Sequence, residues 1–284
     1  MPTFALVAQG EMGAGLARRL TDNGAEVLTL LAGRSQASRA RAKVADMREA
    51  GWSEMREAEI FLSVVPPSFA LDLARQAADS WRGAERTPLY VDCNAVSPRT
   101  AVEIAQVVAE AGMDFVDAGV IGGPPRAGGA GPRLYACGVR AADFAALRNF
   151  GLDVRDLSAP IGAASALKMS YAGITKGMTA IGAVMILAAM RTHAGPALKS
   201  ELAVSQPERL AWLERQIQGM FPKAYRWVGE MEEIAAFVGD EFAGAEAFSA
   251  IARFYERIAS HEGGEGGPAA AAHAFFSAES DAAR

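Results

Sequence analysis

The residues of this chain that are best suited to bind an anion lie in a turn near its start. An apolar run at residues 3–7 predicts a β-strand, and Gly10-Glu11-Met12-Gly13 follows it and opens an amphipathic helix. A glycine at position 10 lets the backbone approach a pyrophosphate, while Gly13 lets the helix pack closely on the strand. The N–H groups at the start of the helix attract the same anion. This turn is therefore predicted to contact a dinucleotide cofactor, although Ala8 replaces the first glycine of the motif and a plain strand-to-helix connection has a similar sequence.

The end of the next predicted strand, residues 26–31, indicates which dinucleotide binds. NAD sites commonly place an acidic residue there to accept hydrogen bonds from the ribose hydroxyls. This chain instead has Arg34 followed by Ser35, with Arg39 and Arg41 close behind. A guanidinium binds a 2′-phosphate with two parallel hydrogen bonds. Arg34 and Ser35 therefore predict NADP, with NAD less favoured, whereas the alternative is that the arginines form a solvated helix face.

A polar stripe on a long predicted helix, residues 164–192, could carry proton chemistry. Lys168, Tyr171 and Thr175 recur at i, i+3 and i+7, so they share one face of a helix that is otherwise apolar or small. A lysine in such surroundings is paired, lies at the rim or is functional. An ammonium group held there can exchange a proton with an alcohol oxygen. The alternative is a lysine whose stem packs on apolar neighbours while its charged end reaches water.

A second glycine-rich run follows the strand predicted at residues 114–120. Gly122 and Gly123 lie just after it, and glycines continue to residue 131. A loop after a strand of an open α/β sheet lies at the edge where such folds bind ligands. The backbone N–H groups of this loop are predicted to bind a substrate carboxylate, unless the run is only a flexible surface loop.

The elements that must position these groups change character near residue 160. Strand and helix patterns alternate before it, as in a doubly wound parallel sheet, and helical patterns dominate after it. Ser205-x-x-Glu208 has the spacing of a helix-capping box. The predicted fold is an α/β Rossmann-like dinucleotide-binding domain at residues 1–160, followed by an all-α substrate and dimerisation domain at 161–284.

Composition narrows the class of protein further. The net charge of −5 argues against a nucleic-acid surface or attraction to anionic membranes. The apolar run at 177–190, about 14 residues, is shorter than the roughly 18–20 that a bilayer requires, so we expect a core helix and no membrane partner. Cys93 and Cys137 are too few for a disulfide framework, and no secretory signal or metal-ligand spacing is seen. We therefore expect a cytoplasmic protein without a metal site.

The order of several motifs resembles the β-hydroxyacid dehydrogenases, relatives of 6-phosphogluconate dehydrogenase. After the glycine turn come Val64-Val65-Pro66-Pro67, Asn94-Ala95-Val96-Ser97-Pro98, Asp117-Ala118-Gly119-Val120-Ile121-Gly122-Gly123 and Gly162-x-x-x-x-x-Lys168. The resemblance covers roughly residues 3–192. The later segment 227–235 is similar to a sub-branch whose helical C-terminal domain has no assigned function.

The resemblance implies roles for these positions. Lys168 would be catalytic, the substrate carboxylate would bind near Gly122 and Gly123, and the nicotinamide would lie near Val65, Pro66 and Asn94. A homodimer through the long helix is also implied. The chain departs from the family pattern at Ile121, where serine is usual, and at Ala172, where asparagine is usual. These departures favour a bulkier or less anionic substrate.

Together these features predict an NADP-dependent oxidoreductase that interconverts an alcohol, of hydroxy-acid type, and a carbonyl by hydride transfer. Tyr171 and Thr175 would help to orient the substrate oxygen. One alternative is an imine reductase on the same fold, with Tyr171 as the proton source. Another is an NADP-binding protein without turnover.

Overall fold

The computed structural model describes residues 1–125, 129–261 and 266–278, and these form two compact units. The first comprises Met1–Met169 and the second Ser170–Arg284. The division falls inside helix α6 (Ala163–Arg191), whereas the sequence analysis placed the boundary just before this helix. Lys168 consequently belongs to the first unit, and Tyr171 and Thr175 to the second.

The first unit is a Rossmann-like domain built on an eight-stranded sheet in the order β3-β2-β1-β4-β5-β6-β7-β8. The strands are β1 (Thr3–Val7), β2 (Glu26–Thr29), β3 (Arg48–Glu49), β4 (Ile60–Ser63), β5 (Leu89–Asp92), β6 (Phe115–Ile121), β7 (Arg133–Cys137) and β8 (Asp153–Asp156). Its α-helices are α1 (Glu11–Asp22), α2 (Gln36–Val44), α3 (Ala70–Trp81), α4 (Pro98–Ala109) and α5 (Ala141–Ala145). Short 3-10 helices lie at η1 (Glu54–Glu57), η2 (Pro67–Phe69) and η3 (Ala146–Phe150).

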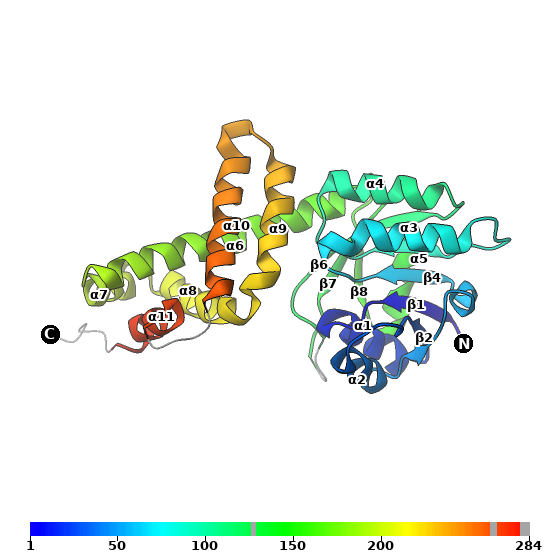
Figure 1. Cartoon of the computed structure of the whole chain (residues 1–284), viewed down its shortest axis with the longest axis horizontal. Helices are drawn as coiled ribbons and strands as arrows, with labels where there is room; N and C mark the ends of the chain where they lie inside the picture. Colours follow the sequence, from blue (N-terminus) through cyan, green and yellow to red (C-terminus); the bar gives the residue numbers. More distant parts are fainter. Residues whose placement is uncertain (126–128, 262–265, 279–284) are drawn as a thin grey trace. The chain divides into compact units, whose positions relative to one another are not determined.

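The helices cover both faces of this sheet, with α3 and α4 on one face and α1 and α2 on the other (Figure 1). Strands buried on both faces read as nearly continuous apolar runs, which is why the sequence revealed most of them. One core layer contains Leu16 and Leu20 of α1, and the opposite layer contains Trp81 of α3 and Ile104 of α4. The fold class predicted from the sequence is confirmed.

The sheet departs from a purely parallel one at a single pairing. β6 and β7 run antiparallel, while all other neighbouring strands are parallel. A parallel pairing needs a crossover of about a dozen residues or more, usually through a helix. The connection between Ile121 and Arg133 is too short for that, so the chain turns back. Strand β3, only two residues long, was not predicted.

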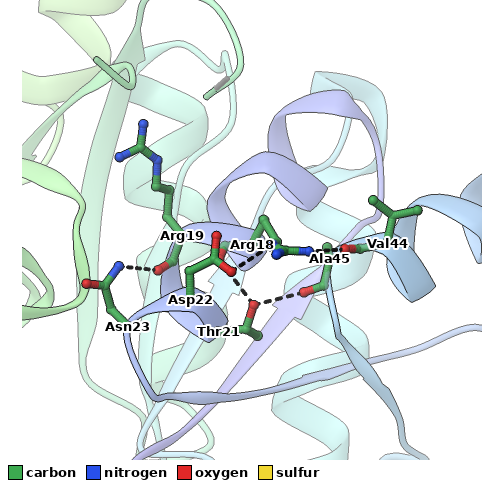
Figure 2. A network of polar contacts seen from close by, with 7 residues as sticks. All are labelled: Arg18, Arg19, Thr21, Asp22, Asn23, Val44 and Ala45. Atoms are coloured by element: carbon green, nitrogen blue, oxygen red, sulfur yellow. Dashed lines mark hydrogen bonds and ion pairs between the residues drawn. The ribbon is translucent and has the colours of Figure 1, made fainter. Parts of the chain in front are cut away.

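Helix α2 is fastened to α1 by polar contacts at their ends, as Figure 2 shows. Arg18 donates to the carbonyl oxygen of Val44 at 2.8 Å and to the carboxylate of Asp22 at 2.7 Å. The hydroxyl of Thr21 donates to the carbonyl oxygen of Ala45 at 3.1 Å. These contacts fix the orientation of α2, whose first turn follows Arg34.

The second unit is helical, as predicted. Beyond its part of α6 it contains α7 (Gly195–Ser205), α8 (Pro207–Met220), α9 (Ala224–Val238), α10 (Gly244–Ser260) and α11 (Pro268–Ser277), with η4 (Phe221–Lys223) and η5 (Glu241–Ala243) between them. A side chain on Gly173 of α6 would come within 3.2 Å of the Phe248 ring, so glycine allows close packing there. Lys176 forms an ion pair with Glu230, and its carbonyl accepts a hydrogen bond from the hydroxyl of Tyr255 at 2.6 Å.

Two sequence interpretations of this unit are wrong. Ser205 does not open a capping box: it ends α7, and its hydroxyl donates to the carbonyl of Glu201 at 2.8 Å, while Pro207 begins α8. The length argument against a membrane also fails, because α6 as a whole is long and apolar enough to cross one, by length and composition only. The core helix of a soluble protein passes the same test of length and composition, so the expectation of no membrane partner stays a prediction.

Candidate active site

The glycine turn forms an open cradle at the start of α1. Gly10 precedes the helix in an extended conformation, and no side chain caps the helix. A Cβ on Gly10 would meet no heavy atom within 4 Å, whereas one on Gly13 would lie 1.9 Å from the carbonyl oxygen of Ala8. Gly13 is therefore required by packing, and Gly10 leaves free space in front of the helix N–H groups, where an anion is favoured.

Gln9 adds an unsatisfied acceptor beside this cradle. Its side chain is buried, and its amide nitrogen donates to the hydroxyl of Thr29 and to the carbonyl of Leu30. Its Oε1 atom has no hydrogen-bond partner among the described residues. Buried polar atoms are rarely left unpaired. An open backbone cradle next to an orphaned acceptor fits a dinucleotide, which carries both phosphates and hydroxyl donors.

The structure separates the three arginines that follow β2. Arg39 donates to the carbonyl of Leu31 at 2.7 Å, and Arg41 donates to the carbonyl of Gln9 at 2.8 Å. Arg34 is exposed; its backbone N–H donates to the carbonyl of Leu31 at 3.0 Å, but its guanidinium makes no hydrogen bond or ion pair with the described residues. Ser35 caps α2, since its hydroxyl accepts from the backbone N–H of Ser38 at 3.2 Å. Arg34 is thus the guanidinium available to a ligand.

A hollow lies beside Arg34 at the carboxyl end of β2. Its volume is about 590 Å³, and its lining includes Leu30, Gly33, Arg34, Trp52 and Gln76. This size lies within the range of small-molecule sites. The ring of Trp52 is half-buried and stacks on Phe61, so it forms a rigid wall.

The residues predicted at the nicotinamide side form one connected group. Asn94 is only 3% exposed, and its side-chain oxygen accepts from the backbone N–H of Val65 at 2.6 Å. Its amide nitrogen donates to the hydroxyl of Ser63 at 2.8 Å and to the carboxylate of Asp92. Pro66, the next residue of this loop, is exposed. Asn94 therefore holds the loop, which leaves Val65 and Pro66 at its surface.

Lys168 is positioned by groups that the sequence analysis did not single out. The carboxylate of Asp117 accepts hydrogen bonds from the backbone N–H groups of Gly162 and Ser165, each at 3.0 Å, and from the hydroxyl of Ser165 at 2.7 Å. A Cβ on Gly119 would lie 3.1 Å from the Cβ of Lys168. Lys168 as a residue is half-buried, and its ammonium has no hydrogen bond or ion pair within the described chain.

The predicted substrate residues are distributed over both units. Gly122 has φ of +125° and its Cβ would meet the Cα of Pro132 at 3.1 Å, so only glycine fits, while Gly123 is open. Residues 126–128 of this run lie outside the described residues. Tyr171 is half exposed, and the hydroxyl of Thr175 donates to the carbonyl of Tyr171 at 2.9 Å.

Two buried acids dominate the electrostatics beneath the loops. Burial, and then the neighbouring charge of Asp117, raise the pKa of Asp92 to about 7. Burial and the same charge raise the pKa of the Cys137 thiol to about 11. No group of His, Cys, Asp and Glu side chains that could hold a metal ion occurs in the described ranges.

Comparison with known proteins identifies the family. The model of the NAD binding domain of 6-phosphogluconate dehydrogenase matches residues 3–150. The chain belongs to this family. A second model, a domain of unknown function (DUF1932), matches residues 189–258. The predicted superfamily, and a C-terminal helical domain without an assigned function, are thereby confirmed, and the first unit is an NAD(P)-binding domain.

Individual relatives agree with this assignment. An uncharacterized 28.5 kDa protein of Methanothermus fervidus is 30% identical over 174 residues, which are 61% of this chain and 64% of that relative. The structure of the conserved protein MTH1747, of unknown function and similar to 3-hydroxyacid dehydrogenases, has a TM-score of 0.70 at 27% identity, covering 90% of this chain and 96% of that one. The 3-hydroxyisobutyrate dehydrogenase of Mycobacterium tuberculosis, with L-serine, shares the fold with a TM-score of 0.69 at 16% identity, covering 98% and 100%.

The two glycines of the turn should respond differently to alanine. In Gly10→Ala the methyl group enters free space, so the melting temperature should change little, while the Kd for the dinucleotide should rise roughly tenfold or more, about 1.4 kcal/mol. In Gly13→Ala the methyl group overlaps the carbonyl of Ala8, which should cost about 1–3 kcal/mol of unfolding free energy. Calorimetry and a fluorescence titration with NADPH measure both quantities. Equal effects of the two variants on stability would contradict this assignment.

Proposed function

We propose that this protein is an NADP-dependent oxidoreductase that interconverts an alcohol and a carbonyl by hydride transfer. The observation that carries the proposal is Lys168, whose unpaired ammonium lies on a helix anchored to β6 of an NAD(P)-binding sheet. An ammonium with no partner among the described residues is free to bind a ligand group or to exchange a proton with it. Relatives of the same fold that are described as 3-hydroxyisobutyrate dehydrogenases support the reaction class.

The residues would divide the chemistry among them. When bound, the nicotinamide accepts or supplies the hydride. Lys168 holds or moves the proton of the substrate hydroxyl, and the open backbone around Gly123 binds an anionic or polar substrate group. Tyr171 and Thr175, on the same helix as Lys168, help to orient the oxygen.

Arg34 supports NADP as the preferred cofactor. Its guanidinium is exposed beside the hollow at the end of β2, whereas Arg39 and Arg41 are engaged by backbone carbonyls. A free guanidinium binds a phosphate bidentately. The 2′-phosphate of NADP would therefore gain a contact that NAD lacks.

The two departures from the family pattern bear on the substrate. Ile121 is 6% exposed and Ala172 is 2% exposed, so both apolar side chains are buried, and neither offers a substrate the polar group that is usual at its position. We therefore infer a substrate that is bulkier or less anionic than a short hydroxy acid. The alternative reaction is the reduction of an imine, so a substrate panel must include cyclic imines.

We also infer that the protein is a homodimer through α6. Six large apolar side chains of this helix are exposed at helical spacing: Tyr171, Ile174, Met178, Ile181, Val184 and Met185. A continuous apolar stripe of this kind marks an interaction surface. A second copy of the same helix matches it in length and in apolar character.

Replacement of the lysine tests the reaction. Lys168→Met should lower kcat by about 10²- to 10⁴-fold, because it removes the proton-transfer group. It should leave the Kd for NADPH within about twofold, since affinity for the cofactor does not depend on proton transfer. Steady-state kinetics over hydroxy acids, aldehydes and cyclic imines, with Lys43→Met on the exposed surface of α2 as the control, measure this. Turnover near the wild-type level in Lys168→Met would exclude the role.

The cofactor preference depends on one charge. Arg34→Ala should raise the Kd for NADPH roughly 10- to 100-fold, as expected for the loss of a charge-assisted hydrogen bond worth about 1.5–3 kcal/mol. The Kd for NADH should change little, and Arg86→Ala, on the exposed surface of the same unit, should alter neither. If the wild type binds both cofactors equally, the argument from the 2′-phosphate fails.

The dimer can be tested by placing a charge in the stripe. Ile181→Glu should yield monomers in size-exclusion chromatography with light scattering, because an unpaired carboxylate would be buried at the interface. Val204→Glu, at a more exposed apolar position on α7, should remain dimeric. A wild-type protein that is monomeric in solution but floats with liposomes would instead assign the stripe to a membrane.

A further inference from the structure

Two buried aspartates lie side by side beneath the candidate active site. Asp92 ends β5 and pairs in register with Asp117 of β6. The two residues are 1% and 0% exposed, respectively. A buried carboxylate is costly unless hydrogen bonds compensate it, and two adjacent ones are more so. What each carboxylate binds therefore indicates why the pair is present.

Asp92 acts on the loop after β4. Its carboxylate accepts from the side-chain nitrogen of Asn94 and, at 3.4 Å, from the backbone N–H of Asn94. This fixes the orientation of the amide, so that the oxygen of Asn94 faces the N–H of Val65 at 2.6 Å. The hydroxyl of Ser63 fixes the same amide from the other side at 2.8 Å. Asp92 thus controls Val65 through one intermediate residue.

Asp117 acts on the opposite side, at the start of α6. Its three hydrogen bonds reach the backbone N–H groups of Gly162 and Ser165 and the Ser165 hydroxyl, and one helical turn separates Ser165 from Lys168. The negative charge also interacts favourably with the positive end of the helix. The thiol of Cys137 donates to the same carboxylate at 3.4 Å.

We propose that Asp92 and Asp117 are paired positioning residues, with Asp92 orienting the Val65–Pro66 loop toward the nicotinamide and Asp117 orienting Lys168. The proposal rests on the proposed function, since it assigns the two halves of that reaction to neighbouring strands. Neither carboxylate touches the substrate. Asp92 positions the loop expected beside the nicotinamide, and Asp117 positions the lysine expected beside the substrate, and hydride transfer requires both to be correctly placed.

Two isosteric variants separate the roles. Asp92→Asn should raise the hydrogen-exchange rate of the Val65 amide at least about tenfold and raise the Kd for NADPH about five- to tenfold, while the Gly162 and Ser165 amides keep their protection. Asp117→Asn should speed exchange at Gly162 and Ser165 and leave the Val65 amide and the Kd for NADPH unchanged within about twofold. With a substrate, Asp117→Asn should lower kcat without changing KM for NADPH. Amide exchange by NMR and NADPH titration need no turnover.

Further variants keep the test decisive. Ser165→Ala removes one of the three hydrogen bonds to Asp117 and can replace Asp117→Asn if that variant does not fold. It should speed amide exchange at Gly162 and Ser165 to a smaller extent and leave the Val65 amide unchanged. Val116→Ala, buried on the opposite face of β6, should lower stability and speed exchange in both segments together. If Asp92→Asn and Asp117→Asn both behave like Val116→Ala, the carboxylates only stabilise the fold and the proposal is wrong. If the exchange pattern appears but the wild type turns over no carbonyl or imine, the positioning roles stand and the proposed reaction fails.

Discussion

The attachment of helix α6 to strand β6 is the constraint on which the candidate active site depends. The carboxylate of Asp117 binds the first N–H groups of the helix, and Gly119 allows its backbone to approach the strand. A Cβ at Gly119 would lie 2.5 Å from the carbonyl of Ala164, closer than any real contact. The distance between the backbones of β6 and α6 is therefore fixed, and this distance determines the position of Lys168 relative to the sheet.

The glycine turn is likewise held in place by hydrogen bonds between side chains and backbone carbonyls. Gln9 links the glycine turn to the end of β2 through its side chain, and Arg41 links the same turn to α2 through the carbonyl of Gln9. The contact with Gln9 occupies the guanidinium of Arg41, and the carbonyl of Leu31 occupies that of Arg39. Of these three arginines, Arg34 is the one whose guanidinium has no hydrogen-bond partner among the described residues.

The sequence predicted the fold well because local patterns decide it. Buried parallel strands are apolar throughout, and the glycine turn and the long helix have strong signatures, so β1 and α6 were located within a residue. The antiparallel direction of β7 was not predicted, because the direction in which a strand pairs depends on the length of the preceding connection and on the neighbouring strand. Ser205 misled because its hydroxyl could bond either forward or backward along the chain, and Pro207 decided the helix start. The roles of Asp92, Asp117 and Gly119 could not be predicted, because each depends on a partner far away in sequence. A carboxylate ending a buried strand was the only available signal.

The division of the chain immediately after Met169 falls within one continuous helix of 29 residues. Lys168 is the penultimate residue of the sheet-bearing unit. The hydrogen bonds that hold the first turn of α6, from Gly162 and Ser165 to Asp117, lie wholly within the same unit. Loosening of the helical unit would therefore leave the anchorage of the first turn of α6, and with it the base of the Lys168 side chain, in place.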